Sequence, residues 1–443
     1  MLPQSLAAAV LLGHISSVAS FGYTPSLVAR SPAASFSSPG LSAFEHARLS
    51  KQNPFQHQQG RLLCPALFKL NQGRRLLGGR SIVSMSSPAQ MPMKSAITFN
   101  VRVCVFGGGS FGLAMASALG RNNIPVTLHV RKQEAADSIN NDHVSLTYLK
   151  GIELPLCVHA TTNAEEALED ATHIVHAVPC QHTRKYLESI KDYIPLDTPV
   201  ISTSKGIETG TLALMNEIFT DTLGDTRDYA FLSGPSFAKE IASGLATAVV
   251  IASESDELAK EAAEMFSSDS FRAFTSRDVE GVEIGGAVKN VIAIAAGMVE
   301  GLGLGTNALA GLVTRGCVEM QLLARTRGAS PSTLMGLSGV GDTFGTCFGP
   351  LSRNRQLGYR LGQGEKLEDI LASSTEVAEG YATALSLVDF IEQRVPQSFR
   401  MDLKFPILFG VAEVLRGERT PLEGMEDLML LPIRMEFFDQ FNE

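Results

Sequence analysis

Short apolar runs alternate with helical patterns along the middle of the chain. The first run, at 101–106, is followed directly by apolar residues at helical spacing over 113–119. Segment 182–190 also has helical spacing. The other runs of strand-forming residues lie at 125–130, 173–178, 199–203, 230–232, 246–252 and 271–274. Strands that alternate with helices predict a largely parallel, doubly wound α/β sheet, in which ligands bind beyond the carboxyl ends of the strands.

The pattern changes near Val282. The remaining residues, about 160, lack strand-like alternation and are typical of helices with glycine-rich connections. The first of these helices is predicted over 284–299, where Lys289 is the only charged residue. We therefore expect an all-α C-terminal domain over 282–443, preceded by an α/β domain over 96–281.

Residues 1–95 differ in composition from both predicted domains. They contain one acidic residue against nine basic ones, a net charge of +8, which leaves −17 on the rest of a chain whose formal net charge is −9. Their Ser-, Arg-, Gln- and Pro-rich sequence is typical of a transit peptide, and the apolar stretch 6–12 followed by small residues at 16–20 resembles a signal peptide. A signal followed by a transit segment, with Phe21 after the expected cleavage point, resembles the bipartite leader of algae with complex plastids. We therefore expect a leader and a plastid protein, with a mitochondrial presequence or a disordered extension of a cytoplasmic protein as the alternatives.

The bulk composition narrows the classes of partner. Hydrophobic residues make up 44% of the chain and charged residues 19%, as in globular proteins with a sizeable core. The acidic body lacks the basic surface that nucleic-acid binding requires, and no apolar run reaches the roughly 18 residues of a membrane span. The six cysteines form no close pairs, and no histidines form a ligand-spaced pair backed by carboxylates. We expect reduced thiols and no metal.

The glycine-rich turn after the first predicted strand is the clearest short motif. Gly107, Gly109 and Gly112 have the spacing G-x-G-x-x-G between a strand and a helix. In a Rossmann-type unit the first glycine permits the tight turn, the second lets a pyrophosphate approach the backbone, and the third lets helix and strand pack closely. The phosphates then lie at the helix N-terminus. The motif predicts a dinucleotide site, with a purely structural turn as the alternative.

The end of the second predicted strand bears on the choice of nucleotide. NAD sites usually place Asp or Glu there, against the ribose hydroxyls, whereas this chain has Arg131 and Lys132. An arginine can pair with the 2′-phosphate that distinguishes NADP from NAD. The sequence therefore favours NADP(H), with NAD(H) as the second choice, and a solvated loop charge is the alternative for Arg131.

Two residues of the C-terminal half are candidates for proton transfer. Lys289 lies in an apolar helix, where burial would lower its pKa towards the range in which a lysine exchanges protons. The alternative is a lysine whose stem packs while its ammonium group reaches the surface. Asp342, in the glycine-rich segment 339–343, is a candidate partner that we expect on a flexible loop rather than on a helix face. An ordinary turn residue is the alternative there.

Segment 352–355, Ser-Arg-Asn-Arg, opens a stretch of helical character. Ser352 suits the N-cap position, and free N–H groups beside two arginines would bind an anion, most naturally a phosphate. A capped, solvated helix start is the alternative. Lys205, Gly234 and Ser236 each follow a predicted strand, which places them at the edge of the sheet where ligands bind.

Together these motifs resemble the NAD(P)-dependent glycerol-3-phosphate dehydrogenases of bacterial and plastid type. The matching blocks occur in the family's order and span nearly all of 100–410. They are Gly-Gly-Gly-Ser-Phe-Gly (107–112), Ser-Lys-Gly-Ile-Glu (204–208), Ser-Gly-Pro-Ser-Phe-Ala-Lys-Glu (233–240), Gly-Gly-Ala-Val-Lys-Asn-Val-Ile-Ala-Ile (285–294), Gly-Val-Gly-Asp (339–342), Ser-Arg-Asn-Arg (352–355) and Val-Ala-Glu-Gly-Tyr (377–381).

The resemblance implies reversible interconversion of dihydroxyacetone phosphate and sn-glycerol 3-phosphate, feeding glycerolipid synthesis, with a homodimer as the expected assembly. Lys289 matches the family's proton acceptor, and with Lys205 and Asp342 it forms the expected catalytic group. Cofactor contacts are implied for the three glycines of the turn and for Ser110, Phe111, Arg131, Lys205, Ala238, Arg353, Val377 and Glu379. Substrate contacts are implied for Lys205, Gly234, Ser236, Lys289, Asp342, Ser352, Arg353 and Asn354.

Two positions depart from the family's pattern. Arg131 stands where some members carry His, and Ser236 replaces the more usual Thr while keeping the hydroxyl.

In the expected reaction, Lys289 as ammonium stabilises the charge on the carbonyl oxygen and donates the proton, while Arg353 holds the phosphate. A silent NADP-binding sensor would need only the nucleotide half, and a ketopantoate-type reductase would need no phosphate site. The two lysines and the anion site argue against both rivals.

Overall fold

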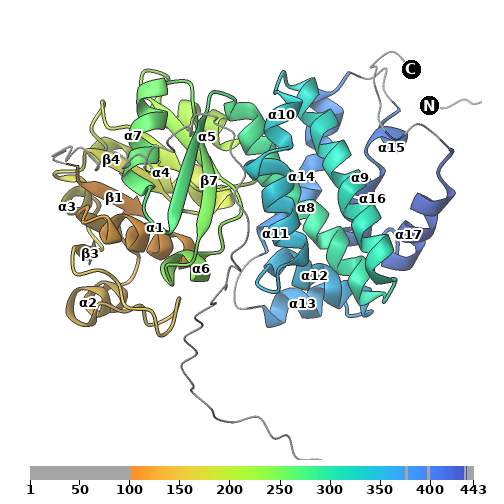
Figure 1. The fold of residues 1–443 in the computed structure, drawn as a ribbon, viewed down its shortest axis with the longest axis horizontal. Helices are drawn as coiled ribbons and strands as arrows, with labels where there is room; N and C mark the ends of the chain where they lie inside the picture. The colour runs from red at the N-terminus through yellow and green to blue at the C-terminus, as the bar shows by residue number, and fades with distance from the viewer. Residues whose placement is uncertain (1–100, 375–377, 397–399, 434–435, 437–443) are drawn as a thin grey trace, which may run out of the picture. The chain divides into compact units, whose positions relative to one another are not determined.

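The computed structural model describes residues 101–374, 378–396, 400–433 and 436. Its first half contains an eight-stranded sheet in the order β3-β2-β1-β4-β5-β6-β7-β8 (Figure 1). The strands are β1 (Val103–Phe106), β2 (Val126–His129), β3 (Val158–Thr161), β4 (His173–His176), β5 (Val200–Ser202), β6 (Tyr229–Ser233), β7 (Thr247–Ser253) and β8 (Phe271–Ser276). Neighbouring strands run parallel except for β6 and β7, which are antiparallel. The predicted, largely parallel α/β sheet is confirmed.

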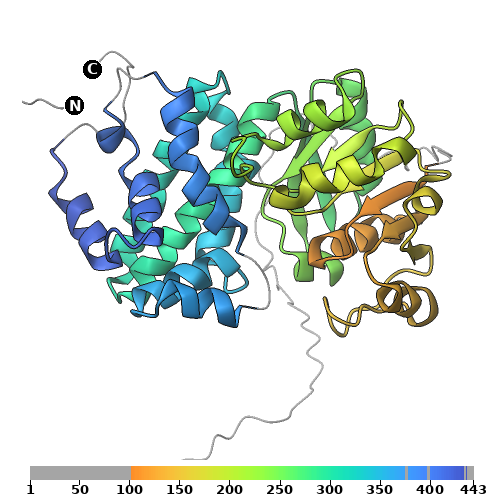
Figure 2. The same cartoon turned by 180° about the vertical axis from the view of Figure 1, so that it is seen from behind.

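Helices cover both faces of this sheet. They are α1 (Ser110–Arg121), α2 (Gln133–Asp142), α3 (Ala164–Leu168), α4 (Cys180–Ile190), the 3₁₀ helix η1 (Lys191–Tyr193), α5 (Met215–Leu223), α6 (Ala238–Ala242) and α7 (Asp256–Phe266). Alternate residues of β1 enter two apolar clusters, because successive side chains of a strand point to opposite faces. Val103 and Val105 pack with residues of α1, whereas Cys104 and Phe106 pack with residues of α4 and α5. Figures 1 and 2 show these two faces in turn, α1 in front in the first and α4 in front in the second.

The second half is helical in the part that the structure describes. It contains α8 (Val279–Gly301), α9 (Gly305–Thr326), α10 (Pro331–Leu334), the π-helix η2 (Leu337–Gly341), α11 (Asp342–Phe348), α12 (Arg353–Gly362), α13 (Leu367–Ser373), α14 (Glu379–Arg394), α15 (Met401–Lys404), α16 (Pro406–Leu415) and α17 (Pro421–Leu430). Glycines let α8 and α12 pack backbone against backbone. A Cβ atom on Gly297 would lie 2.0 Å from the carbonyl oxygen of Arg355, and one on Gly358 would lie 1.9 Å from that of Ile294.

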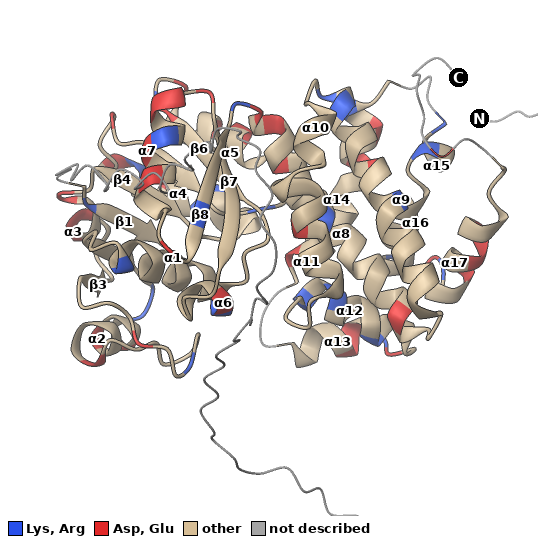
Figure 3. Ribbon diagram, in the orientation of Figure 1, with Lys and Arg blue, Asp and Glu red and all other residues tan. Residues whose placement is uncertain are grey.

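Helix α8 forms the centre of this half. By length and composition alone it could cross a membrane, but 94% of its most apolar 18-residue window is buried inside the protein. Its apolar residues from Ile284 to Val299 belong to one large cluster together with residues of α9, α12, α14 and α16. Charged residues are also scarce in the strands of the sheet, and β1 and β7 contain none (Figure 3). Helix α8 is therefore a core helix.

The predicted strands and the helical C-terminal half agree with the structure, but one strand of the sheet was missed. Strand β3, of sequence Val-His-Ala-Thr, was not predicted, because four residues with one exposed histidine give too short an alternation. The predicted boundary between residues 281 and 282 stays a prediction, and α8 begins at Val279. The predicted leader, 1–95, and Cys64 lie outside the described residues. The five described cysteines are free thiols.

Candidate active site

The glycine turn has the geometry that the motif predicts. Gly107 has φ +105°, a left-handed conformation that favours glycine. A Cβ atom on Gly112 would lie 1.9 Å from the carbonyl oxygen of Gly107, so only glycine lets α1 start this close to the turn. A Cβ atom on Gly109 would meet nothing within 4 Å, and Gly109 caps α1 without a side-chain hydrogen bond. Open space therefore faces the N-terminus of α1, which is where a pyrophosphate fits.

The other predicted nucleotide contacts lie beside this turn or at neighbouring strand ends. Ser110 and Phe111 are the first two residues of α1, and Ala238 is the first residue of α6. Arg131 follows β2, is exposed, and makes no hydrogen bond or ion pair within the described residues. Its guanidinium group is available for a ligand. Val377 lies outside the described residues.

Three charged side chains from distant parts of the chain meet in a buried cluster. Lys205 lies in the loop after β5, Lys289 lies in the middle of α8, and Asp342 is the first residue of α11. The Nζ atom of Lys205 lies 2.6 Å from one carboxylate oxygen of Asp342, and the Nζ atom of Lys289 lies 3.0 Å from the other. Lys289 is 9% exposed and Asp342 is 3% exposed. Lys289 therefore does not extend to the surface, and one carboxylate holds both ammonium groups.

The charges in this cluster shift one another's titration. Burial alone would raise the pKa of Asp342, but the ammonium groups of Lys205 and Lys289 outweigh it and hold that pKa below its usual range. Burial lowers the pKa of Lys205; the carboxylate of Asp342 opposes this effect, and the like charge of Lys289 adds to it. Asp342 is therefore ionised at neutral pH, whereas Lys205 gives up its proton more readily than an exposed lysine.

Two residues that were not predicted complete the cluster. Thr346, one turn after Asp342 on α11, accepts a hydrogen bond of 2.9 Å from Lys289. Gly286 lies one turn before Lys289 on the same face of α8, and a Cβ atom there would lie 3.2 Å from Cγ and 3.3 Å from Cδ of Lys205. The stem of Lys205 therefore crosses α8 at a glycine. A glycine inside an apolar helix was the available signal for this close approach.

The expectation that Asp342 lies on a flexible loop was wrong. Asp342 begins α11 directly after η2, and a Cβ atom on Gly339 of η2 would lie 1.9 Å from the carbonyl oxygen of Leu334. The glycines of this segment serve tight backbone packing within helical turns rather than a loop. Because the segment is helical, Asp342 and Thr346 lie one turn apart on α11, and both contact Lys289.

Ser352 caps α12, as predicted, by accepting a hydrogen bond of 3.2 Å from the backbone N–H of Arg355. Arg353 is exposed at the helix start, whereas Arg355 forms an ion pair of 2.5 Å with Glu300. The sequence predicts two arginines beside the N–H groups of this helix start, and in the structure a carboxylate engages the guanidinium group of one of them, Arg355. Asn354 is buried at the first turn.

Asn354 links three helices. Its amide nitrogen donates to the side-chain oxygen of Asn290 at 2.9 Å, and its oxygen accepts from the backbone N–H of Gly380 at 3.0 Å. Asn290 follows Lys289 on α8, and Gly380 follows Glu379 at the start of α14. The contact fixes Glu379 near the cations of the site: burial raises the pKa of Glu379, while Arg353, Lys289 and Lys205 lower it.

Gly234 and Ser236 form the turn after β6. Gly234 has φ +136°, and a Cβ atom there would lie 3.0 Å from the Cα atom of Val249 on the neighbouring strand. The hydroxyl group of Ser236 donates to the carbonyl oxygen of Gly234 at 2.8 Å. The turn packs against the helical half, because Pro235 lies 3.5 Å from the position of a Cβ atom on Gly345 of α11. Among the described residues, no group of three or more His, Cys, Asp or Glu side chains has the arrangement of a metal site.

Comparison with known proteins matches both halves of the chain. A family model described as NAD-dependent glycerol-3-phosphate dehydrogenase N-terminus matches residues 102–259, and its C-terminus counterpart matches residues 278–426. A chloroplastic glycerol-3-phosphate dehydrogenase of Arabidopsis thaliana, named for NAD(+), is 45% identical over 375 residues, which cover 83% of this chain and 88% of the relative. The glycerol-3-phosphate dehydrogenase of Myxococcus xanthus, named for NAD(P)+, is 48% identical over 331 residues, which cover 74% and 97%. The solved glycerol-3-phosphate dehydrogenase of Coxiella burnetii has a TM-score of 0.70 at 31% identity and covers 75% of this chain and 99% of its own.

Proposed function

Because the chain belongs to the NAD-dependent glycerol-3-phosphate dehydrogenase family, we propose that it interconverts dihydroxyacetone phosphate and sn-glycerol 3-phosphate. The observation that carries the proposal is the buried cluster in which Asp342 holds the ammonium groups of Lys205 and Lys289. Buried charges are costly unless they are paired or used, and two lysines on one carboxylate leave one positive charge in excess. That excess suits a substrate that carries negative charge.

The nucleotide would lie on the turn formed by Gly107, Gly109 and Gly112, with its pyrophosphate at the N-terminus of α1 beside Ser110 and Phe111. When bound, the reduced nicotinamide supplies a hydride to C2 of dihydroxyacetone phosphate. We assign Ala238, Val377 and Glu379 to the same site on the family's pattern. The open space beside Gly109 supports this position for the nucleotide.

We favour NADP(H) as the preferred nucleotide. Arg131 is exposed at the end of β2 and makes no ion pair within the described residues, so that it can pair with a 2′-phosphate. No carboxylate stands at that position to receive the ribose hydroxyls of NAD(H). NAD(H) remains the second substrate of the same site.

Lys289 would act as the general acid in the reductive direction. Its ammonium group stabilises the negative charge that develops on the carbonyl oxygen and donates the proton that this oxygen takes up. In the oxidative direction Lys289 is neutral and accepts the proton from the alcohol. Thr346 and Asp342 hold its Nζ atom, at 2.9 Å and 3.0 Å, and so orient it. Lys205 contributes a second positive charge to the same site.

The phosphate of the substrate would lie at the start of α12. Arg353 is exposed there, and Ser352 caps the helix beside it. The N–H groups of a helix start favour negative charge, and a guanidinium group binds phosphate with two parallel hydrogen bonds. Asn354, Gly234 and Ser236 complete the proposed substrate site. Holding the phosphate fixes C2 opposite the nicotinamide.

We infer the domain division and the cellular setting from the sequence and the relatives. We propose an α/β nucleotide-binding domain over 96–281, an all-α substrate domain over 282–443 and a targeting leader over 1–95. The basic, acid-poor leader and the Arabidopsis relative, which is named chloroplastic, support a plastid protein. A plastid enzyme of this activity would supply the glycerol phosphate for glycerolipid synthesis. We propose a homodimer as the assembly.

The direct test is the oxidation of NADPH and NADH, compared side by side, with dihydroxyacetone phosphate. We expect turnover with both nucleotides, faster with NADPH at low concentration, and a loss of at least about 100-fold in kcat/KM with unphosphorylated dihydroxyacetone, because the phosphate contacts are missing. Absence of turnover with either nucleotide would refute the proposed reaction. Equal rates with the unphosphorylated substrate would remove the phosphate site, and a preference for NADH would remove the role of Arg131.

A further inference from the structure

The loop that carries Lys205 connects β5 to α5 and contains several conformations that are unfavourable without support. Gly206 and Gly210 have φ +135° and +90°, and Leu212 has φ +58°, which is strained for a residue with a side chain. Between them lies Glu208, three residues after Lys205 and 8% exposed. Such a loop keeps one conformation only if neighbouring elements hold it.

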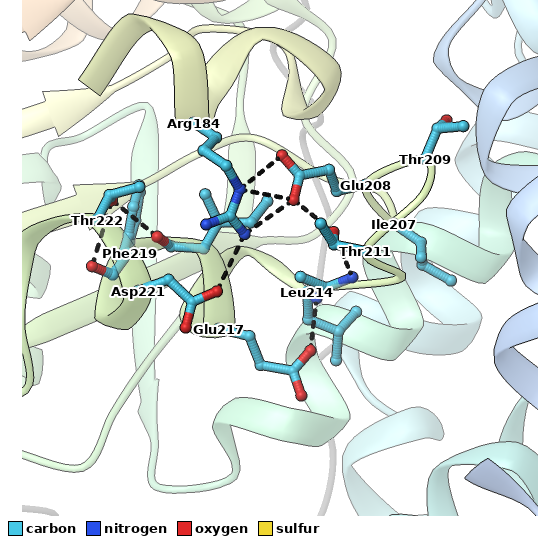
Figure 4. Close-up of polar contacts among 12 residues, drawn as sticks. Arg184, Ile207, Glu208, Thr209, Thr211, Leu214, Glu217, Phe219, Asp221 and Thr222 are labelled. Atoms are coloured by element: carbon cyan, nitrogen blue, oxygen red, sulfur yellow. Dashed lines mark hydrogen bonds and ion pairs between the residues drawn. The ribbon is translucent and has the colours of Figure 1, made fainter. Parts of the chain in front are cut away.

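Helix α4 holds the loop through an arginine (Figure 4). The Nε atom of Arg184 lies 3.1 and 3.0 Å from the two carboxylate oxygens of Glu208, and its NH2 group lies 2.9 Å from one of them. Thr211 donates its hydroxyl hydrogen to the same carboxylate. The Nη2 atom of Arg184 that contacts Glu208 also lies 3.1 Å from a carboxylate oxygen of Asp221 on α5. Glu208 is thus buried with a planar partner that fixes its direction.

A second contact from α4 fixes the residues on either side of Glu208. The side-chain amide of Gln181 donates to the carbonyl oxygen of Ile207 at 2.7 Å and accepts from the backbone N–H of Thr209 at 2.9 Å. Because α4 begins at Cys180, four residues after the end of β4, its first two turns are rigidly attached to the sheet. The loop is therefore fastened to the nucleotide-binding half of the protein just beyond Lys205.

The end of the loop that carries Lys205 is held by different contacts. Lys205 reaches Asp342 with a stem that lies across Gly286, and neither contact fixes the backbone at 204–206. Ser204, just before Lys205, donates its hydroxyl hydrogen to the carbonyl oxygen of Val178 at 2.6 Å. Residues 207–209, just after Lys205, are held by the side chains of α4. A shift of residues 207–209 would move the ammonium group of Lys205 relative to Lys289.

We propose that Arg184 and Glu208 are positioning residues that act through Lys205 and set where its ammonium group lies in the active site. The proposal rests on the proposed function. It assigns the pair no contact with substrate or nucleotide. Glu208 belongs to a sequence block shared with the family, but the block alone gives no reason for a carboxylate there. The contact with Arg184 gives that reason.

The test is a double-mutant cycle between Glu208→Gln and Lys205→Ala, read as kcat/KM for dihydroxyacetone phosphate. In the wild-type background we expect Glu208→Gln to lower kcat/KM about 10- to 100-fold, because a misplacement of about 1 Å costs a rate of that order. In the Lys205→Ala background the same change should have an effect below about 2-fold. The Kd for NADPH of Glu208→Gln should stay near the wild-type value, and its rates are measured well below its thermal midpoint, because loss of the buried contact with Arg184 lowers stability.

Two further variants keep the result decisive. Arg184→Lys keeps the charge and loses the planar contact, and should show a smaller loss with the same dependence on Lys205. Glu280→Gln breaks a partly buried ion pair between α8 and Arg327, the residue that follows α9, and should leave kcat/KM unchanged. Equal fold-losses in both backgrounds, or a loss of NADPH binding, would overturn the positioning role. An inactive wild-type protein would instead refute the proposed function.

Discussion

The substitution Asp342→Asn tests the buried cluster by removing its only carboxylate charge. Asp342 contacts Lys205 at 2.6 Å and Lys289 at 3.0 Å, and all three side chains are almost completely buried. At an effective dielectric constant of about 20, each contact corresponds to an attraction of about 6 kcal/mol before desolvation. Removing one partner of a buried ion pair costs about 3–5 kcal/mol, because the remaining charge is buried without compensation. We expect Asp342→Asn to lower the free energy of unfolding by an amount in this range.

The loss should depend on pH with a defined sign. The contribution of Asp342 is fully present above its unfolded pKa of about 3.9, so it is intact from about pH 6 to about pH 9. The folded pKa of Lys205 lies below its unfolded value, so the unfolded chain binds more protons between these values and stability rises with pH there. Without Asp342 the main group that opposes this lowering is gone, so that Lys205 loses its charge at a lower pH. The deficit of Asp342→Asn should therefore shrink from about pH 6 to about pH 9.

The assay is thermal unfolding of both proteins at the two pH values. A loss of about 3–5 kcal/mol lowers the Tm by about 10 °C in a protein of this size. The control is Asp256→Asn, which breaks an exposed ion pair with Arg277 and should lower the Tm far less, because exposed ion pairs contribute little to stability. A deficit of Asp342→Asn no larger than that of the control, or one that grows towards about pH 9, would refute the reasoning.

Three other substitutions test separate parts of the account. Arg353→Ala should raise the KM for dihydroxyacetone phosphate about 10- to 100-fold in steady-state kinetics, because it removes a charge-assisted contact with phosphate; an unchanged KM would take Arg353 out of the phosphate site. Arg131→Ala should weaken NADPH binding at least about 10-fold in a fluorescence titration and leave NADH binding unchanged; equal effects on both nucleotides would contradict the 2′-phosphate contact. Glu283 is 8% exposed, accepts one backbone hydrogen bond from Asn216, and has its pKa raised to about 8 by burial, so it contributes stability that is lost as the pH rises from about 4.5 to about 8. Glu283→Gln should therefore raise the free energy of unfolding at pH 8, by up to about 5 kcal/mol, and change it little near pH 5 in urea titrations; a destabilised variant at pH 8 would refute this assignment.

The sheet and the nucleotide turn were predictable because their signals are local. Strand-forming runs alternate with helical ones, and the glycines at 107, 109 and 112 lie between a strand pattern and a helix pattern, with the spacing of a dinucleotide-binding turn. Strand β3 was missed because its four residues are too few for a period to stand out. Strand β7 was predicted, but its antiparallel direction relative to β6 leaves no mark in its own sequence.

The candidate site was predictable as a set of residues but not as an arrangement. Lys289 stood out as a charge in an apolar helix, yet its partner lies 53 positions away in the sequence and is reached through a π-helix that no pattern predicted. The contact of Lys205 with Gly286 and the hydrogen bond from Asn354 to Asn290 depend on how the elements pack against one another. The periodicity of a single sequence carries no information about this packing. The same reason explains why Arg184 and Glu208 carried no signal.

The most direct test of the central claim is the turnover of Lys289→Ala with NADPH and saturating dihydroxyacetone phosphate, measured beside the Kd for NADPH. If Lys289 holds and donates the proton at the carbonyl oxygen, kcat should fall about 100- to 10,000-fold, and the Kd should stay within about 2-fold of the wild-type value. Near-normal turnover of the variant would contradict the assignment of the buried cluster as the catalytic centre.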